Sequence, residues 1–257
     1  MKESDQGPRS TVIPTIADMH AEIAATPGAI GHNAIELVRR YLYVFVGNAM
    51  ELKAHLESLR DPAVSLPVIS NVPEHQAAGE VFDRELIRRL HNFVSSVKSL
   101  IEHSRNLVRK MYPSGELRAE YDKRAAAFAA NPRRRLVQQL REYVLHNRLP
   151  PTIESSSFSR VDEGFEMTTS VALDYEILLE HGKWDADVRE LLRSGEKLDL
   201  LELVDEYLDQ VAEMYLWFIE AQFREHRADI DATNAMIEEF KRQVGQPREW
   251  DPPKTSA

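Results

Sequence analysis

The chain has 257 residues, of which 43% are hydrophobic and 29% are charged, a composition typical of a globular protein rather than of a disordered chain. It contains no Cys, which excludes disulfide scaffolds, Cys-ligated zinc, iron–sulfur clusters and thiol nucleophiles. Gly is scarce, at 10 residues, and no glycine-rich phosphate loop or nucleophile-elbow motif occurs. The formal net charge of −10 would by itself argue against a nucleic-acid partner.

The charge is, however, unevenly distributed along the chain. Residues 84–148 hold 15 Lys and Arg against 6 Asp and Glu, a net charge of +9, whereas residues 149–257 carry a net charge of −14. Segregation of this kind indicates either an anionic partner at the basic segment or an acidic helix of the same chain packed beside it. Both interpretations stay open at this point.

The two ends of the chain are polar. Residues 1–13 lack the apolar core of a signal peptide, and both 1–13 and 245–257 are predicted to be disordered. Apolar runs are broken by charge well short of the roughly 18 residues that a membrane helix needs. We therefore expect a cytoplasmic protein with no membrane contact.

Apolar residues recur every three or four positions along most of the chain, which predicts long helices. The first is expected to begin at Asn33, where Glu36 completes a capping-box pattern, and to stop at Asp61-Pro62, followed by a Pro-containing loop to Pro73. The next helices are predicted at 74–111, at 115–130 with Ser114 as its cap, and at 132–149 with Asn131 as its cap.

The period then changes from helical to alternating. Residues 153–172 are predicted to form a β-hairpin with its turn at 162–164, after which helices resume near Asp174. A last long helix covers the stripe from Leu201 to Phe218. The sequence therefore predicts a mainly α protein, an antiparallel helical bundle forming a single domain over 14–244, with one small inserted hairpin.

Self-association is predicted from the second long helix. The apolar stripe of this helix, from Leu86 to Met111, is widened by further apolar residues, so the helix is apolar on more than one side. An uncovered apolar stripe usually marks an interface, which predicts a homodimer.

Metal and cofactor sites are not expected. The nine His residues include no Glu-x-x-His pair and no HExxH motif, and Glu51/His55 and Glu142/His146 have only the spacing of surface pairs. A Ser/His/Asp site is set aside because the fold is predicted to be helical and no nucleophile elbow is present.

Three consecutive cations begin the helix that follows Asn131. Arg133, Arg134 and Arg135 lie in its first turn, where the helix dipole favours anions. Cations at a helix N-terminus are locally unfavourable, so their presence there points to a function. We expect these three Arg residues, together with Arg148 at the other end of the helix, to contact nucleic-acid phosphates. The simpler interpretation is three solvated side chains on a surface turn.

Arg141 and His146 lie further along the same helix. Five residues rotate a helix by 500°, so the two side chains start about 140° apart, but the long Arg side chain allows both heads to reach one anion. The pair supplies a guanidinium that holds a phosphate and an imidazole that transfers a proton near neutral pH.

The segment Leu140-Arg-Glu-Tyr-Val-Leu-His-Asn-Arg-Leu-Pro150 resembles the signature of the HEPN superfamily, in which His follows Arg after four to six residues. The layout of elements over 81–223 is similar as well. The resemblance implies a helical domain that binds RNA or a nucleotide, usually as a dimer, and often a metal-independent ribonuclease of a toxin–antitoxin or phage-defence system. Arg141 would then stabilise the phosphate charge and His146 would transfer the proton. Glu142 departs from the Asn, Asp or His that often follows the Arg, and its carboxylate would repel substrate.

Two other functions remain open. A non-catalytic interaction or scaffold protein would use the basic segment to dock an acidic partner, and a helical bundle could hold a small molecule between its helices. Arg141, His146 and Arg133–Arg135 in one open cleft would favour RNA. The same residues covered by carboxylates such as Glu202, Glu206 or Glu213 would favour the structural interpretation.

Overall fold

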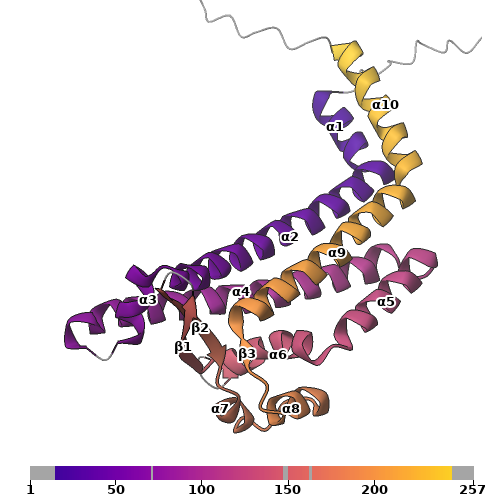
Figure 1. Cartoon of the computed structure of the whole chain (residues 1–257). Helices are drawn as coiled ribbons and strands as arrows, with labels where there is room; N and C mark the ends of the chain where they lie inside the picture. The colour runs from indigo at the N-terminus through magenta and orange to yellow at the C-terminus, as the bar shows by residue number, and fades with distance from the viewer. Residues whose placement is uncertain (1–14, 71, 147–149, 162–163, 245–257) are drawn as a thin grey trace, which may run out of the picture. The chain divides into compact units, whose positions relative to one another are not determined.

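The computed structural model describes residues 15–70, 72–146, 150–161 and 164–244. Within them the chain is mainly helical, with one small antiparallel sheet, which confirms the predicted fold class (Figure 1). The segments predicted to be disordered, 1–13 and 245–257, lie outside the described residues.

The chain divides into two compact units, and the single domain over 14–244 stays a prediction. The smaller unit combines the N-terminal residues up to Ile35 with those from Gln222 onward, and the larger unit spans Glu36–Ala221. Both boundaries fall inside long helices, α2 (Pro27–Glu57) and α9 (Leu200–Glu225). No Pro, Gly-rich stretch or change of period marks these points, so the sequence pattern runs across them without a signal.

The smaller unit also contains α1 (Ile16–Ala24) and α10 (Arg227–Val244). Two glycines near the start of α2 allow close packing there. A Cβ at Gly28 would collide with the backbone carbonyl of Asp229, and one at Gly31 would collide with the ring of His226.

The larger unit holds the remaining elements: a 3-10 helix (Ser58–Arg60), α3 (Pro62–Ile69), a second 3-10 helix (Pro73–His75), α4 (Gln76–Met111), α5 (Glu116–Ala129), α6 (Pro132–His146), the three strands, α7 (Tyr175–Leu179) and α8 (Ala186–Arg193).

The core of the larger unit is centred on aromatic rings from α2, α4 and α9. The rings of Phe45, Phe93 and Tyr207 lie with centroids 5.9–6.1 Å apart and are buried. Burial of such large apolar side chains holds the three helices side by side.

The start of α2 differs from the prediction. The helix begins at Pro27, and Asn33 lies within it. The cap is Thr26, whose hydroxyl accepts a hydrogen bond from the backbone N–H of Ala29 at 3.2 Å. Thr followed by Pro at the first helical position is a stronger start than Asn33, because Pro has no N–H to leave unpaired.

Other boundaries are partly as predicted. The expected loop after Asp61 contains α3, because the Asp61 carboxylate caps it by accepting from the Ala63 N–H at 2.9 Å. Gly115, at φ 101°, precedes α5 in place of Ser114, and no side chain caps that helix. Asn131 caps α6 as predicted, accepting from the N–H of Arg133 at 2.9 Å.

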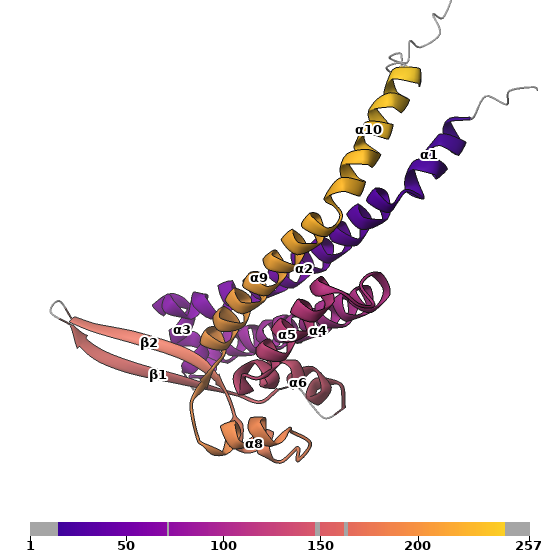
Figure 2. The same ribbon diagram turned by 90° about the vertical axis from the view of Figure 1, so that its right-hand side faces the viewer.

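The predicted hairpin is present as β1 (Thr152–Val161) and β2 (Gly164–Leu173) (Figure 2). The strands pair antiparallel from Thr152↔Leu173 to Val161↔Gly164. A short third strand, β3 (Leu198–Asp199), pairs with the end of β2. Two residues are too few to show an alternating pattern, which is why the sequence did not reveal β3.

The apolar stripe of α4 is buried within the chain. Leu86, Leu90, Val94, Val97 and Leu100 are each no more than 2% exposed. The reason for predicting a dimer through this helix therefore does not hold, since other elements of the chain cover the stripe.

A carboxyl pair joins the hairpin to α4 and predicts a pH dependence. Burial, followed by the charge of Asp83 and a hydrogen bond with it, raises the pKa of Glu154 to about 7 from its ordinary value of 4.5. Because this pKa is raised in the folded state, Glu154 makes a contribution to the free energy of unfolding that is fully present below about pH 4.5. That contribution is lost as the pH rises through about 7. Glu154→Gln should therefore reduce the difference in melting temperature between pH 5 and pH 8. Glu176→Gln, at an exposed carboxyl, is the control; an equal effect of both substitutions would contradict the prediction.

Candidate nucleic-acid interface

Helix α6 carries most of the predicted site and is anchored by its apolar side. Leu136 and Leu140 are buried, and the ring of Tyr143 stacks on Trp184 at 5.6 Å. The Trp184 indole N–H donates to the carbonyl oxygen of Leu178 at 2.6 Å, which fixes that ring. Because these residues hold the helix, its polar side chains can act without carrying its packing.

Arg133 is engaged by acidic side chains from the C-terminal part of the larger unit. Its guanidinium lies 2.5 Å from Glu196 Oε1, 3.0 Å from Glu206 Oε2 and 3.8 Å from Glu202 Oε2. Its side chain is only 21% exposed. Two of the carboxylates named above as covering groups thus surround this cation.

Arg135 and Arg134 are also engaged. Arg135 pairs with Asp187 at 2.7 Å and Asp185 at 3.0 Å, and its hydrogen bond lowers the pKa of Asp187. Arg134 donates to the carbonyl oxygen of Phe128 at 3.2 Å and lies 5.1 Å over its ring. Carboxylates distant in sequence therefore compensate Arg133 and Arg135, while Arg134 is engaged by the nearby Phe128. Arg148, predicted to contact nucleic acid, lies outside the described residues.

Arg141 and His146 are brought together by one carboxylate. Glu142 Oε1 lies 3.5 Å from Arg141 Nη1, and Glu142 Oε2 lies 3.5 Å from His146 Nε2. Lys98 of α4 adds a third basic group, with Nζ 3.7 Å from Glu142 Oε1. The two heads thus converge on one anion despite their angular separation on the helix, and the anion is the side chain that interrupts the motif.

Further basic and imidazole groups lie next to this cluster. The ring of His181 packs edge-on against Tyr143 at 5.1 Å. Burial lowers the pKa of His181, and the charges of Lys183 and His146 lower it further. His181 is therefore favoured as the neutral base beside His146.

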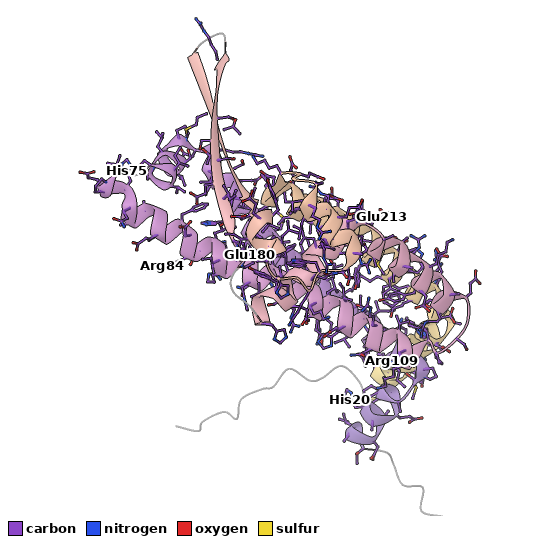
Figure 3. All side chains as sticks on the ribbon, turned by 90° about the horizontal axis from the view of Figure 1, so that it is seen from below. His20, His75, Arg84, Arg109, Glu180 and Glu213 are labelled. Atoms are coloured by element: carbon purple, nitrogen blue, oxygen red, sulfur yellow. The ribbon has the colours of Figure 1, made fainter. Side chains whose placement is uncertain are left out.

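The same face of α4 continues the positive charge away from the cluster. Lys98, Arg105 and Arg109 are spaced by seven and four residues, which places them on one side of the helix. An open groove of about 610 Å³ between α4 and α5 is lined by Arg105, Arg109 and Arg118, and also by Glu102 and by Asp122, which pairs with Arg118 at 2.6 Å. Figure 3 views the molecule from below, with α4 running from the labelled Arg84 to Arg109.

Sequence reasoning missed Lys98 and this groove. The spacing of the α4 cations was a usable signal, whereas the Arg–His motif points only to α6. Lys98 is also paired with Glu102 at 3.2 Å, so the face is not uniformly positive.

Neither a metal site nor a membrane-spanning helix is found in the part of the chain that the structure describes. No group of three or more His, Asp or Glu side chains is placed to hold a metal ion. No helix among these residues has the length and apolarity to cross a membrane.

Comparison with known proteins gives no match: no protein family, no curated protein and no solved structure is similar to this chain. The resemblance to the HEPN superfamily therefore rests on the motif and layout alone and stays a prediction.

Proposed function

We propose that the protein binds RNA through its phosphates at the cluster formed by Lys98, Arg141 and His146. The observation that carries this proposal is the convergence of all three side chains on the Glu142 carboxylate, within 3.5–3.7 Å. A carboxylate and a phosphate oxygen accept hydrogen bonds from the same donors. Side chains that converge on a carboxylate can therefore also bind a phosphate.

Glu142 acts in this proposal as an internal competitor. An incoming phosphate displaces its carboxylate, whose side chain is 47% exposed and can turn toward water. Affinity is therefore modest, and its dependence on salt is steep, because the attraction is electrostatic.

The groove between α4 and α5 extends the contact. Arg109 lies eleven positions after Lys98, which corresponds to about 16 Å along the helix. The basic face of α4 is therefore longer than one phosphate group. A single strand following this face would meet Arg105 and Arg109 after leaving the cluster. Readout of bases is not needed for such binding.

The cluster also has the groups for metal-independent cleavage. The ribose 2′-hydroxyl would attack the adjacent phosphorus as its proton passes to an imidazole, and the bond to the 5′-oxygen would break as that oxygen receives a proton. Arg141 would stabilise the charge on the phosphoryl oxygens, with His146 in proton transfer and His181 as the neutral imidazole nearby. This chemistry requires no metal, so the assay is done in EDTA.

Labelled single-stranded RNA, followed by fluorescence anisotropy and gel electrophoresis, tests the proposal. Wild-type protein should bind with a log–log salt slope of about −0.7 for each phosphate contacted. Arg141→Ala should weaken binding about tenfold, since it removes a charge-assisted hydrogen bond. His146→Ala should remove any cleavage, while the melting temperature of both variants stays near that of wild type.

Arg84→Ala serves as the matched control. Arg84 lies on α4 as well and pairs only with Glu80 at 2.8 Å in the described residues, so its loss should leave RNA affinity unchanged. Binding that is flat with salt, or equally affected by Arg84→Ala and Arg141→Ala, would contradict the proposal.

One observation favours a second candidate, a non-catalytic interaction protein. Arg133 and Arg135 are occupied by carboxylates of the same chain, which is how a basic segment behaves when its acidic partner is internal. Absence of RNA binding at low salt, with intact folding, would select this candidate.

A further inference from the structure

One face of α2 in the larger unit exposes apolar side chains. Leu37, Tyr43, Val44 and Met50 are 41%, 81%, 52% and 48% exposed. Gly47 lies among them, and a Cβ placed there would meet nothing within 4 Å. Apolar surface of this kind, gathered on one element, is typical of a contact surface.

Helix geometry gathers these residues into a single strip. At 100° per residue they occupy an arc of about 140° on the side of α2 opposite Phe45, which points into the core. The strip, defined here as the α2 face, comprises Leu37, Arg40, Tyr43, Val44, Gly47, Met50, Glu51 and Ala54. Phe45 contacts Phe93 of α4 and Tyr207 of α9, and Figure 1 shows these two helices running alongside α2.

The α2 face carries two charges of opposite sign. Arg40 has no ion pair or hydrogen bond within the described part of the chain, and it is exposed. Glu51 forms long ion pairs, with its carboxylate 3.8 Å from Arg88 and 3.9 Å from Arg89, but its side chain is still 55% exposed. Both charged side chains are therefore accessible to a partner.

We propose that the α2 face binds a second copy of this chain, with the two α2 helices antiparallel about a two-fold axis between Phe45 and Val46. The sequence of the α2 face supports a second copy as the occupant, because two antiparallel copies of this face are complementary. The antiparallel arrangement places Arg40 opposite Glu51 of the partner subunit and Val44 opposite Gly47 of the partner subunit. Two-fold symmetry then forms each contact twice.

Tyr43 and Met50 fit the same register. Tyr43 comes within two residues of Met50 of the partner subunit along the axis, which allows a sulfur–aromatic contact. Gly47 removes the side chain that would hold the helices apart, so that Val44 can enter the space.

This inference is independent of the proposed RNA function. It uses none of the cations of the α6 cluster, and it replaces α4 with α2 as the surface of self-association. A dimer without RNA binding, or RNA binding by a monomer, would therefore separate the two proposals.

Charge reversal with rescue tests the interface. The mass of the full chain is measured by light scattering and sedimentation over a range of micromolar concentrations. Wild type should be dimeric, while Arg40→Glu and Glu51→Arg should each weaken the dimer at least about tenfold, because each creates two like-charge contacts. The double variant Arg40→Glu/Glu51→Arg should restore the dimer, which a misfolded protein could not do.

Arg84→Glu, a reversal on α4 outside the α2 face, should leave the mass unchanged. A monomeric wild type would overturn the proposal, as would a dimer that tolerates both single reversals. Failure of the double variant to recover, with a circular dichroism spectrum like that of wild type, would overturn the antiparallel register.

Discussion

Arg133→Ala is expected to lower the free energy of unfolding by about 1–2 kcal/mol and to leave RNA affinity nearly unchanged. The substitution removes the cation between Glu196, Glu202 and Glu206, which would then repel one another. Because Arg133 is only 21% exposed, water screens this loss less than at a surface pair. The effect is measured by chemical denaturation followed by circular dichroism.

The control is Arg84→Ala, whose side chain is 74% exposed and whose partner is the single carboxylate of Glu80. Its effect on stability should stay within about 0.5 kcal/mol. A stable Arg133→Ala protein that has lost RNA binding would show instead that this Arg contacts phosphate.

Gly28→Ala is expected to destabilise the smaller unit by about 3 kcal/mol, because a Cβ at this position collides with the backbone carbonyl of Asp229. A backbone group cannot turn aside as a side chain can, so α10 must shift. Hydrogen exchange by mass spectrometry should show lost protection in peptides from 227–242.

Gly79→Ala is the matched helical control. Its Cβ would meet only the Val68 carbonyl oxygen at 3.6 Å, an ordinary contact. The better helix propensity of Ala should make that variant neutral or slightly more stable. Equal exchange in wild type and Gly28→Ala would contradict the close packing of the smaller unit.

Elements with local signals could be predicted from the sequence. Helix α4 follows a long regular stripe, Asn131 caps α6, and the hairpin shows a change of period. The start of α2 was misplaced because Asn33 and Glu36 imitate a capping box inside a helix. The strand β3 was not predictable, since its two residues form a strand only through pairing with β2.

The candidate site was predictable only in part. The motif pointed to Arg141 and His146, and the structure places both beside Glu142. The carboxylates that engage Arg133 lie more than 60 residues later in the chain, so only tertiary structure brings them together. Lys98 reaches the site from α4 for the same reason.

The affinity of Glu142→Gln for single-stranded RNA tests the central claim most directly. Gln keeps the shape of Glu and removes the charge that holds Lys98, Arg141 and His146. Removing one like charge near a phosphate is worth about 1 kcal/mol at an exposed site, so binding at low salt should become about fivefold tighter than in wild type. Affinity that is unchanged or weaker in Glu142→Gln, in a protein that is folded as wild type is, would contradict the claim that Glu142 occupies a phosphate-binding site.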